Sequence, residues 1–178
     1  MTKKKMNLSL KSLIVLLSIC LVVAVLMAAI NALTAPKIDE ANAKAEQEAL
    51  SAVLPEATEF EKLEGEYPAT VTALYRDKGG AGYAAMLSAE GYDSSKPMTI
   101  AVGFDAEGKI LAVEVVSVSG ETSGIGTKVE GENFLSQFVG KDRTLDGVDT
   151  ISGATISSSA FKNAVRDASE AVAKEVAS

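Results

Sequence analysis

The stretch SLIVLLSICLVVAVLMAAINAL, residues 12–33, decides the architecture of this chain. No charged residue occurs between positions 12 and 35. At about 1.5 Å per helical residue, these 22 residues are long enough to cross the roughly 30 Å hydrocarbon layer of a bilayer. A cleaved signal peptide is the competing interpretation, but the apolar centre of such a peptide is normally about 7–15 residues long. We therefore predict a retained transmembrane helix over residues 12–33.

Charges are distributed unequally on the two sides of this segment. The tail before it, residues 1–11, contains four lysines and no acidic residue. Basic residues favour the cytoplasmic side, so we expect a single-pass protein of the cell (inner) membrane with a cytoplasmic N-terminus and an extracytoplasmic C-terminal domain. The residues after position 33 hold 13 of the 17 basic side chains and all 24 acidic ones. Such a domain repels nucleic acid, and no nucleic-acid partner is expected.

Histidine is absent and Cys20 is the only cysteine, which limits the cofactors that this chain can bind. Haem, an iron–sulfur cluster and structural zinc all need His or Cys ligands that the chain does not supply. Cys20 lies within the apolar stretch, where a free thiol behaves as a small hydrophobic group. Any redox cofactor is therefore organic or belongs to another chain.

The residues after the membrane segment show a change from helical to strand patterning. Residues 34–58 predict a membrane-proximal helix or linker, because Pro36 suits a first helical turn and apolar residues recur at helical spacing until Pro55. Four β-prone runs follow, with turn residues at 78–80 and 105–108, and we predict antiparallel strands there. The runs cover residues 69–75, 82–87, 99–104 and 110–118.

The C-terminal part of the sequence predicts helices. A short apolar helix is expected over residues 133–139, and an amphipathic helix over residues 157–176. The apolar stripe of the second helix consists of Phe161, Val165, Ala168, Val172 and Val176. The predicted fold class is α+β: one N-terminal transmembrane helix, then a domain of antiparallel strands flanked by helices over residues 59–178. The pattern leaves the strand order open.

The segment DTISGATISS, residues 149–158, stands directly before the last predicted helix. It offers hydroxyl groups, backbone amides and a flexible glycine, but no charged base. Free N–H groups and the positive dipole at a helix N-terminus favour a phosphate group. The alternative is an ordinary loop in which Ser157 or Ser158 caps the helix. Composition alone favours the capping interpretation, because capping serines are common.

The same segment carries a family resemblance. Asp149-x-x-Ser152-Gly153-Ala154-Thr155, followed by x-Ser-Ser, resembles the flavinylation motif of a family of FMN-binding domains. The family includes the G-type component of Rnf electron-transport complexes and the C-type component of sodium-pumping NADH:quinone reductase. The resemblance implies FMN joined to Thr155 by a phosphoester bond. A flavin transferase with FAD as donor and a magnesium ion would install it. The neighbouring residues implied in cofactor binding are Ser152, Gly153, Ala154, Ser157 and Ser158.

A second loop supports this resemblance. Residues 121–126, ETSGIG, are similar to the Glu-Thr-x-Gly-hydrophobic-Gly loop that lies against the flavin in the family. The resemblance implies that Glu121, Thr122 and Gly124 belong to the cofactor site. An ordinary glycine turn is the alternative, since the loop lacks the third glycine and the strand–helix context of a dinucleotide fingerprint.

Further similarity to the family extends over nearly the whole chain, with two departures. Matching segments occur at residues 34–38, 53–55, 91–92 and 134–138. Residues 93–97, DSSKP, stand where relatives often have a tighter glycine-rich turn, and no histidine precedes Glu121. These departures concern contacts to the flavin ring and leave the attachment at Thr155 unaffected.

The resemblance implies the RnfG component of an Rnf complex, an ion-translocating ferredoxin:NAD oxidoreductase in which this chain carries electrons through FMN. The complex would couple electron transfer between ferredoxin and NAD to sodium or proton translocation, and its other subunits would be the partners. The chain would contain no catalytic residue of its own. Within the flavin class, the alternatives are the quinone-reductase component and a free-standing flavinylated extracellular carrier. The compact chain favours Rnf.

Two further alternatives belong to other classes. One is a membrane-tethered binding module without cofactor. The other is a serine acyl-transfer enzyme, because Ser159-x-x-Lys162 fits the Ser-x-x-Lys pattern of penicillin-recognising enzymes. The Ser-Asp-Asn and Lys-Thr-Gly elements of those enzymes are missing, so we interpret Ser159 and Lys162 as exposed helix positions.

Overall fold

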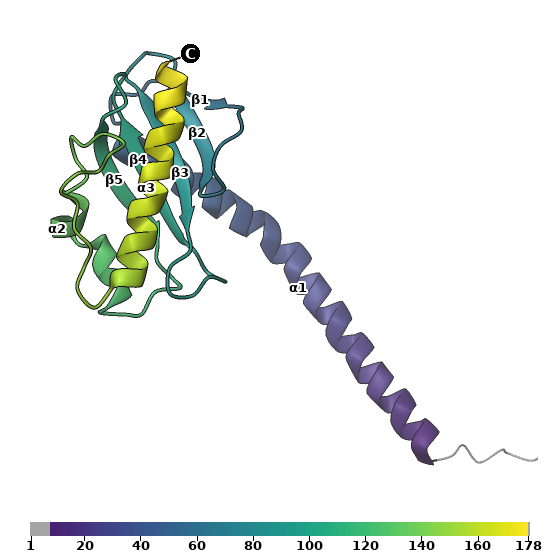
Figure 1. Cartoon of the computed structure of the whole chain (residues 1–178). Helices are drawn as coiled ribbons and strands as arrows, with labels where there is room; N and C mark the ends of the chain where they lie inside the picture. The colour runs from purple at the N-terminus through teal and green to yellow at the C-terminus, as the bar shows by residue number, and fades with distance from the viewer. Residues whose placement is uncertain (1–7, 178) are drawn as a thin grey trace, which may run out of the picture. The chain divides into compact units, whose positions relative to one another are not determined.

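The computed structural model of the chain describes residues 8–177. It contains one long helix, a five-stranded sheet and C-terminal helices, which confirms the α+β class (Figure 1). The chain divides into two units within the long helix, one ending at Lys44 and the other beginning at Ala45. The elements are α1 (Leu8–Val53), β1 (Phe60–Leu63), β2 (Val71–Asp77), β3 (Tyr83–Ala89), β4 (Met98–Phe104), β5 (Ile110–Ser117), the 3-10 helix η1 (Gly126–Glu130), α2 (Glu132–Leu135) and α3 (Thr155–Val176).

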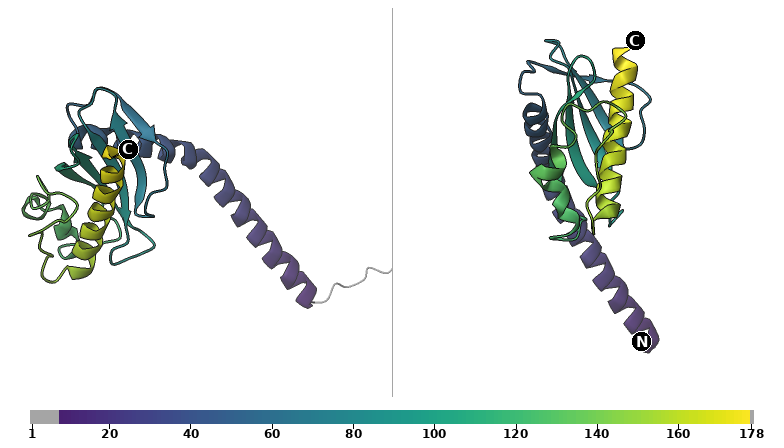
Figure 2. Two further views of the ribbon diagram at one scale, coloured as in Figure 1. Left: turned by 45° about the horizontal axis from the view of Figure 1, so that its top comes forward. Right: turned by 60° about the vertical axis from the view of Figure 1, so that its left-hand side comes forward.

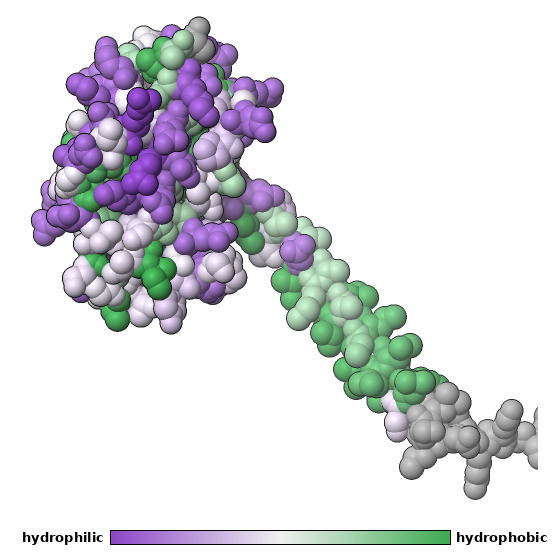
Figure 3. Space-filling model, viewed as in Figure 1, coloured by the Kyte–Doolittle hydropathy of each residue, from purple (hydrophilic) through white to green (hydrophobic). Residues whose placement is uncertain are grey.

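The described residues of the first unit form the N-terminal part of α1. Its leucine, isoleucine and valine side chains between Leu13 and Leu33 are exposed, and Figure 3 shows them as a continuous hydrophobic surface. Within the described residues, α1 is the one helix long and apolar enough to cross a membrane. An uncovered apolar surface of this length is unfavourable in water and is satisfied by lipid. The unit therefore has the properties of a membrane anchor.

Pro36 lies inside α1, where the sequence predicted the start of a new helix. Proline has no N–H and removes one backbone hydrogen bond from a helix interior. The residues that follow are mostly Ala, Glu, Lys and Gln, which strongly favour helix, so the helix continues to Val53. The predicted linker, residues 34–58, is therefore helical over most of its length.

The sheet is an antiparallel meander in the order β1-β2-β3-β4-β5. Each strand pairs with its neighbour in the sequence, as in the pairing of Tyr83 with Phe104. Asp105 begins the β4–β5 turn, and its Oδ1 accepts hydrogen bonds from the N–H groups of Glu107 and Lys109 at 3.1 and 2.7 Å. The four predicted strands are confirmed to within two residues at each end. Strand β1 was not predicted.

Two layers cover the two faces of the sheet in the second unit (Figures 1 and 2). Helix α3 packs on one face and contributes the fully buried Phe161, which contacts the rings of Phe134 and Phe138 at centroid distances of 5.3 and 5.5 Å. The last turns of α1 pack on the other face through Leu50 and Val53. The domain core therefore includes the end of the helix whose apolar part forms the other unit.

The predicted C-terminal helices differ from the structure at their ends. Helix α3 begins at Thr155, two residues earlier than predicted. Val176 was assigned to the buried stripe, but it is 42% exposed because it lies at the C-terminal end of the helix. In the predicted helix at 133–139, regular helix ends at Leu135 and turns follow.

Asp77 is a buried carboxylate at the end of β2. Hydrogen bonds from the backbone N–H of Ala81, and then from those of Glu59 and Thr58, lower the pKa of Asp77 well below its usual range, against the opposing effect of burial. All these partners are donors, so the carboxylate serves as an acceptor that joins the β2–β3 turn to the start of β1.

Candidate functional site

The turn before α3 is held by its own hydrogen bonds. Ser158 Oγ accepts a bond from the N–H of Ile151 at 3.0 Å and donates one to the carbonyl of Ala154 at 2.8 Å. The N–H of Ala154 also donates to the carbonyl of Ile151 at 3.0 Å. Gly153 adopts a φ of +82°, a left-handed conformation that glycine takes without steric cost. The backbone that leads into Thr155 is therefore fixed by the buried Ser158.

The N-terminus of α3 has no side-chain cap. Ala154 occupies the cap position and makes no side-chain hydrogen bond there. The first helical bond runs from the N–H of Ser158 to the carbonyl of Ala154, so the N–H groups of residues 155–157 precede the regular helical ladder. The structure thus contradicts capping by Ser157 or Ser158. An uncapped helix N-terminus concentrates positive partial charge at Thr155.

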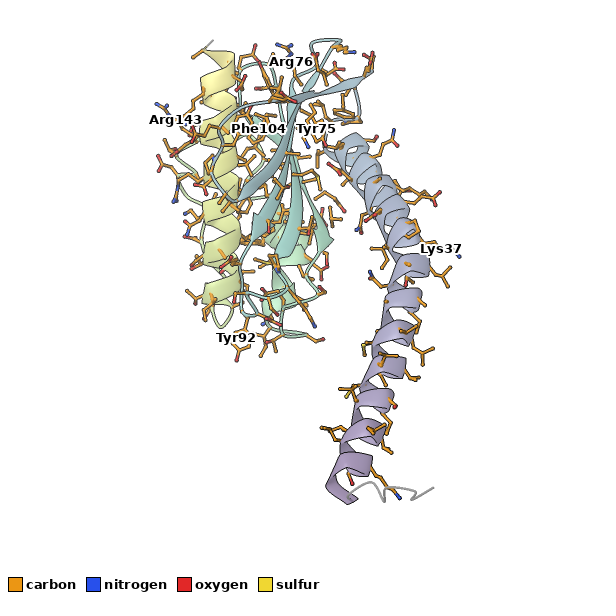
Figure 4. The ribbon with its side chains drawn as sticks, turned by 90° about the vertical axis from the view of Figure 1, so that its right-hand side faces the viewer. Lys37, Tyr75, Arg76, Tyr92, Phe104 and Arg143 are labelled. Carbon is orange, nitrogen blue, oxygen red and sulfur yellow. The ribbon has the colours of Figure 1, made fainter. Side chains whose placement is uncertain are left out.

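A cavity of about 470 Å³ opens beside this helix end. Thr155 itself is exposed, and Tyr92 and Ile156 at the cavity are 70% and 60% exposed. Figure 4 shows Tyr92 beside the N-terminal end of α3. Three separate segments line the cavity, contributing Tyr92, then Thr122, Ile125 and Gly126, and finally Gly153, Ala154, Thr155, Ile156 and Ser157.

Glu121 connects these three segments. Its Oε1 accepts a hydrogen bond from the N–H of Tyr92 at 3.0 Å, and its Oε2 accepts one from the hydroxyl of Ser157. The loop after Glu121 is closed by its backbone, because the carbonyl of Thr122 accepts bonds from the N–H groups of Ile125 and Gly126 at 3.1 and 2.8 Å. The N–H of Gly124 donates to Thr127 Oγ1 at 2.9 Å.

The structure brings both predicted motifs together at one cavity. Of the nine predicted residues, five line it: Gly153, Ala154, Thr155, Ser157 and Thr122. The remaining four, Ser152, Ser158, Glu121 and Gly124, lie in the same turn or loop, where Ser158 and Glu121 bond to protein groups. Sequence reasoning did not assign Tyr92, Ile125, Gly126 and Ile156 to the site. All four lie within or next to segments that resemble the family, and this proximity could have indicated them.

The described residues that line this cavity include no Asp, Glu, Lys or Arg side chain. Within the described residues, no group of three or more His, Cys, Asp and Glu side chains could hold a metal ion. Lys162 donates to the carbonyl of Val148 at 2.6 Å, so its ammonium group is engaged by backbone and not placed as a base for Ser159. Both side chains are half-buried, whereas the sequence predicted exposed positions.

The cavity suits a phosphorylated, partly apolar ligand. The uncapped end of α3 provides N–H donors for a phosphate group. Exposed Tyr92, Ile125 and Ile156 provide apolar surface of the kind that a flat aromatic ring covers. The residues present therefore fit FMN, which combines a phosphate with a planar ring system.

Comparison with known families agrees with this geometry. The family described as FMN-binding domain matches residues 91–170, a range that contains every lining residue of the cavity. The apolar helix and this match together indicate a membrane-anchored protein with an FMN-binding domain. The family described as RnfG N-terminal region matches residues 1–53. Together the two matches are those of an RnfG-type subunit with an FMN-binding domain. No curated protein matches the chain.

Proposed function

We propose that the domain carries FMN covalently, through a phosphoester bond to Thr155. The observation that supports this most directly is the position of Thr155. It is the exposed first residue of α3, at an uncapped helix end and at the edge of the cavity. A phosphate esterified to its hydroxyl would lie within reach of the free N–H groups of the first turn. The exposed apolar side chains at the cavity, Tyr92, Ile125 and Ile156, would then be available to contact the flavin ring.

An external enzyme would make the attachment, because no Asp, Glu, Lys or Arg is among the described residues that line the cavity at Thr155. In the proposed reaction, Thr155 Oγ forms a bond to the FMN phosphorus of FAD, and the bond between that phosphorus and the bridging oxygen breaks. AMP leaves, and the hydroxyl proton is released. A flavin transferase with a magnesium ion would supply the activation. The contribution of this chain is an accessible hydroxyl on a fixed turn.

We further propose that the chain serves as an electron carrier in an Rnf complex. Bound FMN accepts and donates electrons, while the protein supplies position and environment. Other Rnf subunits would be the partners, and the complex would couple transfer between ferredoxin and NAD to movement of sodium ions or protons. The lysines before α1 support a cytoplasmic N-terminus and an extracytoplasmic domain. The match to the RnfG N-terminal region favours this assignment over the quinone-reductase component.

Intact mass tests the covalent bond. The full chain is expressed with and without a flavin transferase, as wild type, as Thr155→Ala and as the control Thr150→Ala, which alters an exposed threonine in the same segment. We expect a gain of about 438 Da, one FMN minus water, in wild type and Thr150→Ala with the transferase. Thr155→Ala should show no gain. A gain that persists in Thr155→Ala, or no gain in any sample, would contradict attachment at Thr155.

A further inference from the structure

We infer that Glu121 is a positioning residue, which assembles the acceptor site around Thr155 before any flavin is attached. This inference rests on the proposed function and deepens it. Resemblance alone assigned Glu121 to contact with the cofactor, but its carboxylate faces protein groups. Its role is to hold the three cavity segments in one arrangement.

The hydrogen bonds of Glu121 join segments that are far apart in the sequence. Tyr92 precedes Glu121 by 29 positions and Ser157 follows it by 36, and each bonds to a different carboxylate oxygen. Ser157 lies in the first turn of α3 and is 97% buried, so the bond reaches the turn that presents Thr155. Tyr92 and Ile125 lie on loops, where no helix or strand hydrogen bonds fix the backbone. The bonds of Glu121 hold these loops in place instead.

Two glycines make room for this carboxylate. A Cβ atom on Gly91 would overlap Glu121 Oε1, and one on Gly126 would overlap Glu121 Oε2 and come within 3.0 Å of Ser157 Oγ. Neither glycine has a positive φ, so close approach is the reason for glycine at both positions. The two loops are therefore shaped around the side chain of Glu121.

Substitutions at position 121 can distinguish whether Glu121 acts through its hydrogen bonds or through its negative charge. A glutamine at position 121 could accept from the N–H of Tyr92 through its oxygen and donate to Ser157 Oγ through its nitrogen, because a hydroxyl both donates and accepts. Glutamine would preserve both bonds and remove the negative charge. Alanine would remove both bonds and leave the N–H of Tyr92 without its partner.

The test compares Glu121→Ala, Glu121→Gln and the control Glu130→Ala, which alters an exposed glutamate at the end of η1. The first measurement is the initial rate of FMN incorporation into the full chain at limiting transferase. We expect Glu121→Ala to be slower by about tenfold, since it loses two hydrogen bonds, and Glu121→Gln and Glu130→Ala to remain within about twofold of wild type. Ser157→Ala loses one of the two bonds, so its rate of incorporation should lie between those of Glu121→Ala and wild type. It replaces Glu121→Ala in the test if that variant does not fold.

The second measurement is amide hydrogen exchange in the chain without flavin. The N–H of Tyr92 should exchange faster in Glu121→Ala and at the wild-type rate in Glu121→Gln. Equal slowing of incorporation in both Glu121 variants would show that charge is what matters and overturn the inference. Wild-type behaviour of Glu121→Ala in both measurements would also overturn it. If wild type incorporates no FMN, the proposed function fails, and exchange at Tyr92 alone then decides whether Glu121 orders the loops.

Discussion

Ser158→Ala offers a quantitative test of the turn that presents Thr155. In the wild type, the fully buried Ser158 Oγ accepts from the N–H of Ile151 and donates to the carbonyl of Ala154. The variant leaves the N–H of Ile151 without its acceptor, which costs about 1–3 kcal/mol. The carbonyl of Ala154 keeps its bond from the N–H of Ser158, and alanine favours helix by a few tenths of a kcal/mol over serine. The net expected loss is about 1–2 kcal/mol.

Thermal unfolding of the full chain in detergent, followed by circular dichroism, measures this loss. A domain of this size loses about 4 °C in Tm for each kcal/mol, so Ser158→Ala should melt roughly 4–8 °C below wild type. Ser152→Ala, which alters an exposed serine in the same turn, should stay within about 2 °C. The reasoning is refuted if Ser158→Ala and Ser152→Ala have the same Tm, because the hydrogen bond from the N–H of Ile151 would then contribute nothing measurable to stability.

Three further predictions concern the domain around the site. Phe161→Ala should destabilise the domain by about 3–5 kcal/mol in thermal or urea unfolding, because it removes a fully buried ring, whereas a loss under about 1 kcal/mol would contradict its place in the core. Gly103→Ala should cost about 1–3 kcal/mol, since its Cβ would overlap the carbonyl of Val53, and an unchanged Tm would show that α1 does not approach β4 so closely. Asp77 has a lowered folded-state pKa, so its contribution is complete above the unfolded pKa of about 3.9 and is lost as the pH falls toward the folded value. The difference in Tm between wild type and Asp77→Asn should therefore be largest near pH 7 and shrink below about pH 4, and a constant difference from about pH 7 to pH 3 would contradict the lowered pKa.

Strands β2 to β5 could be predicted because β-prone residues marked each strand and turn residues marked several of the strand ends. Strand β4, for example, combines β-branched and aromatic residues with the turn that begins at Asp105. Strand β1 escaped prediction because FEKL has only two apolar residues and is a half-exposed edge strand whose position depends on pairing with β2. The order of the strands depends on such pairings and has no local signal.

The two motifs of the candidate site could be located from the sequence, but their arrangement around one cavity could not. Thr155 and its neighbours carry a specific pattern, and their place at a helix N-terminus follows from the periodicity of α3. The early start of that helix depends on the buried contacts of Ser158, which reach back to Ile151. The orientation of Glu121 depends on Tyr92 and Ser157, and no local rule connects positions so far apart.

The meander order has a consequence for how the domain is completed during synthesis. Each strand pairs with the one made just before it, so the sheet can grow from local contacts as the chain emerges, a topology associated with rapid folding. Helix α3 is the last element, and Thr155 is its first residue. The face of α3 that packs on the sheet, which includes Phe161, becomes buried only after the strands have formed. Under the proposed function, a flavin transferase that recognises the assembled turn would thus encounter it only on chains whose sheet is finished, so FMN would be attached only to correctly folded molecules.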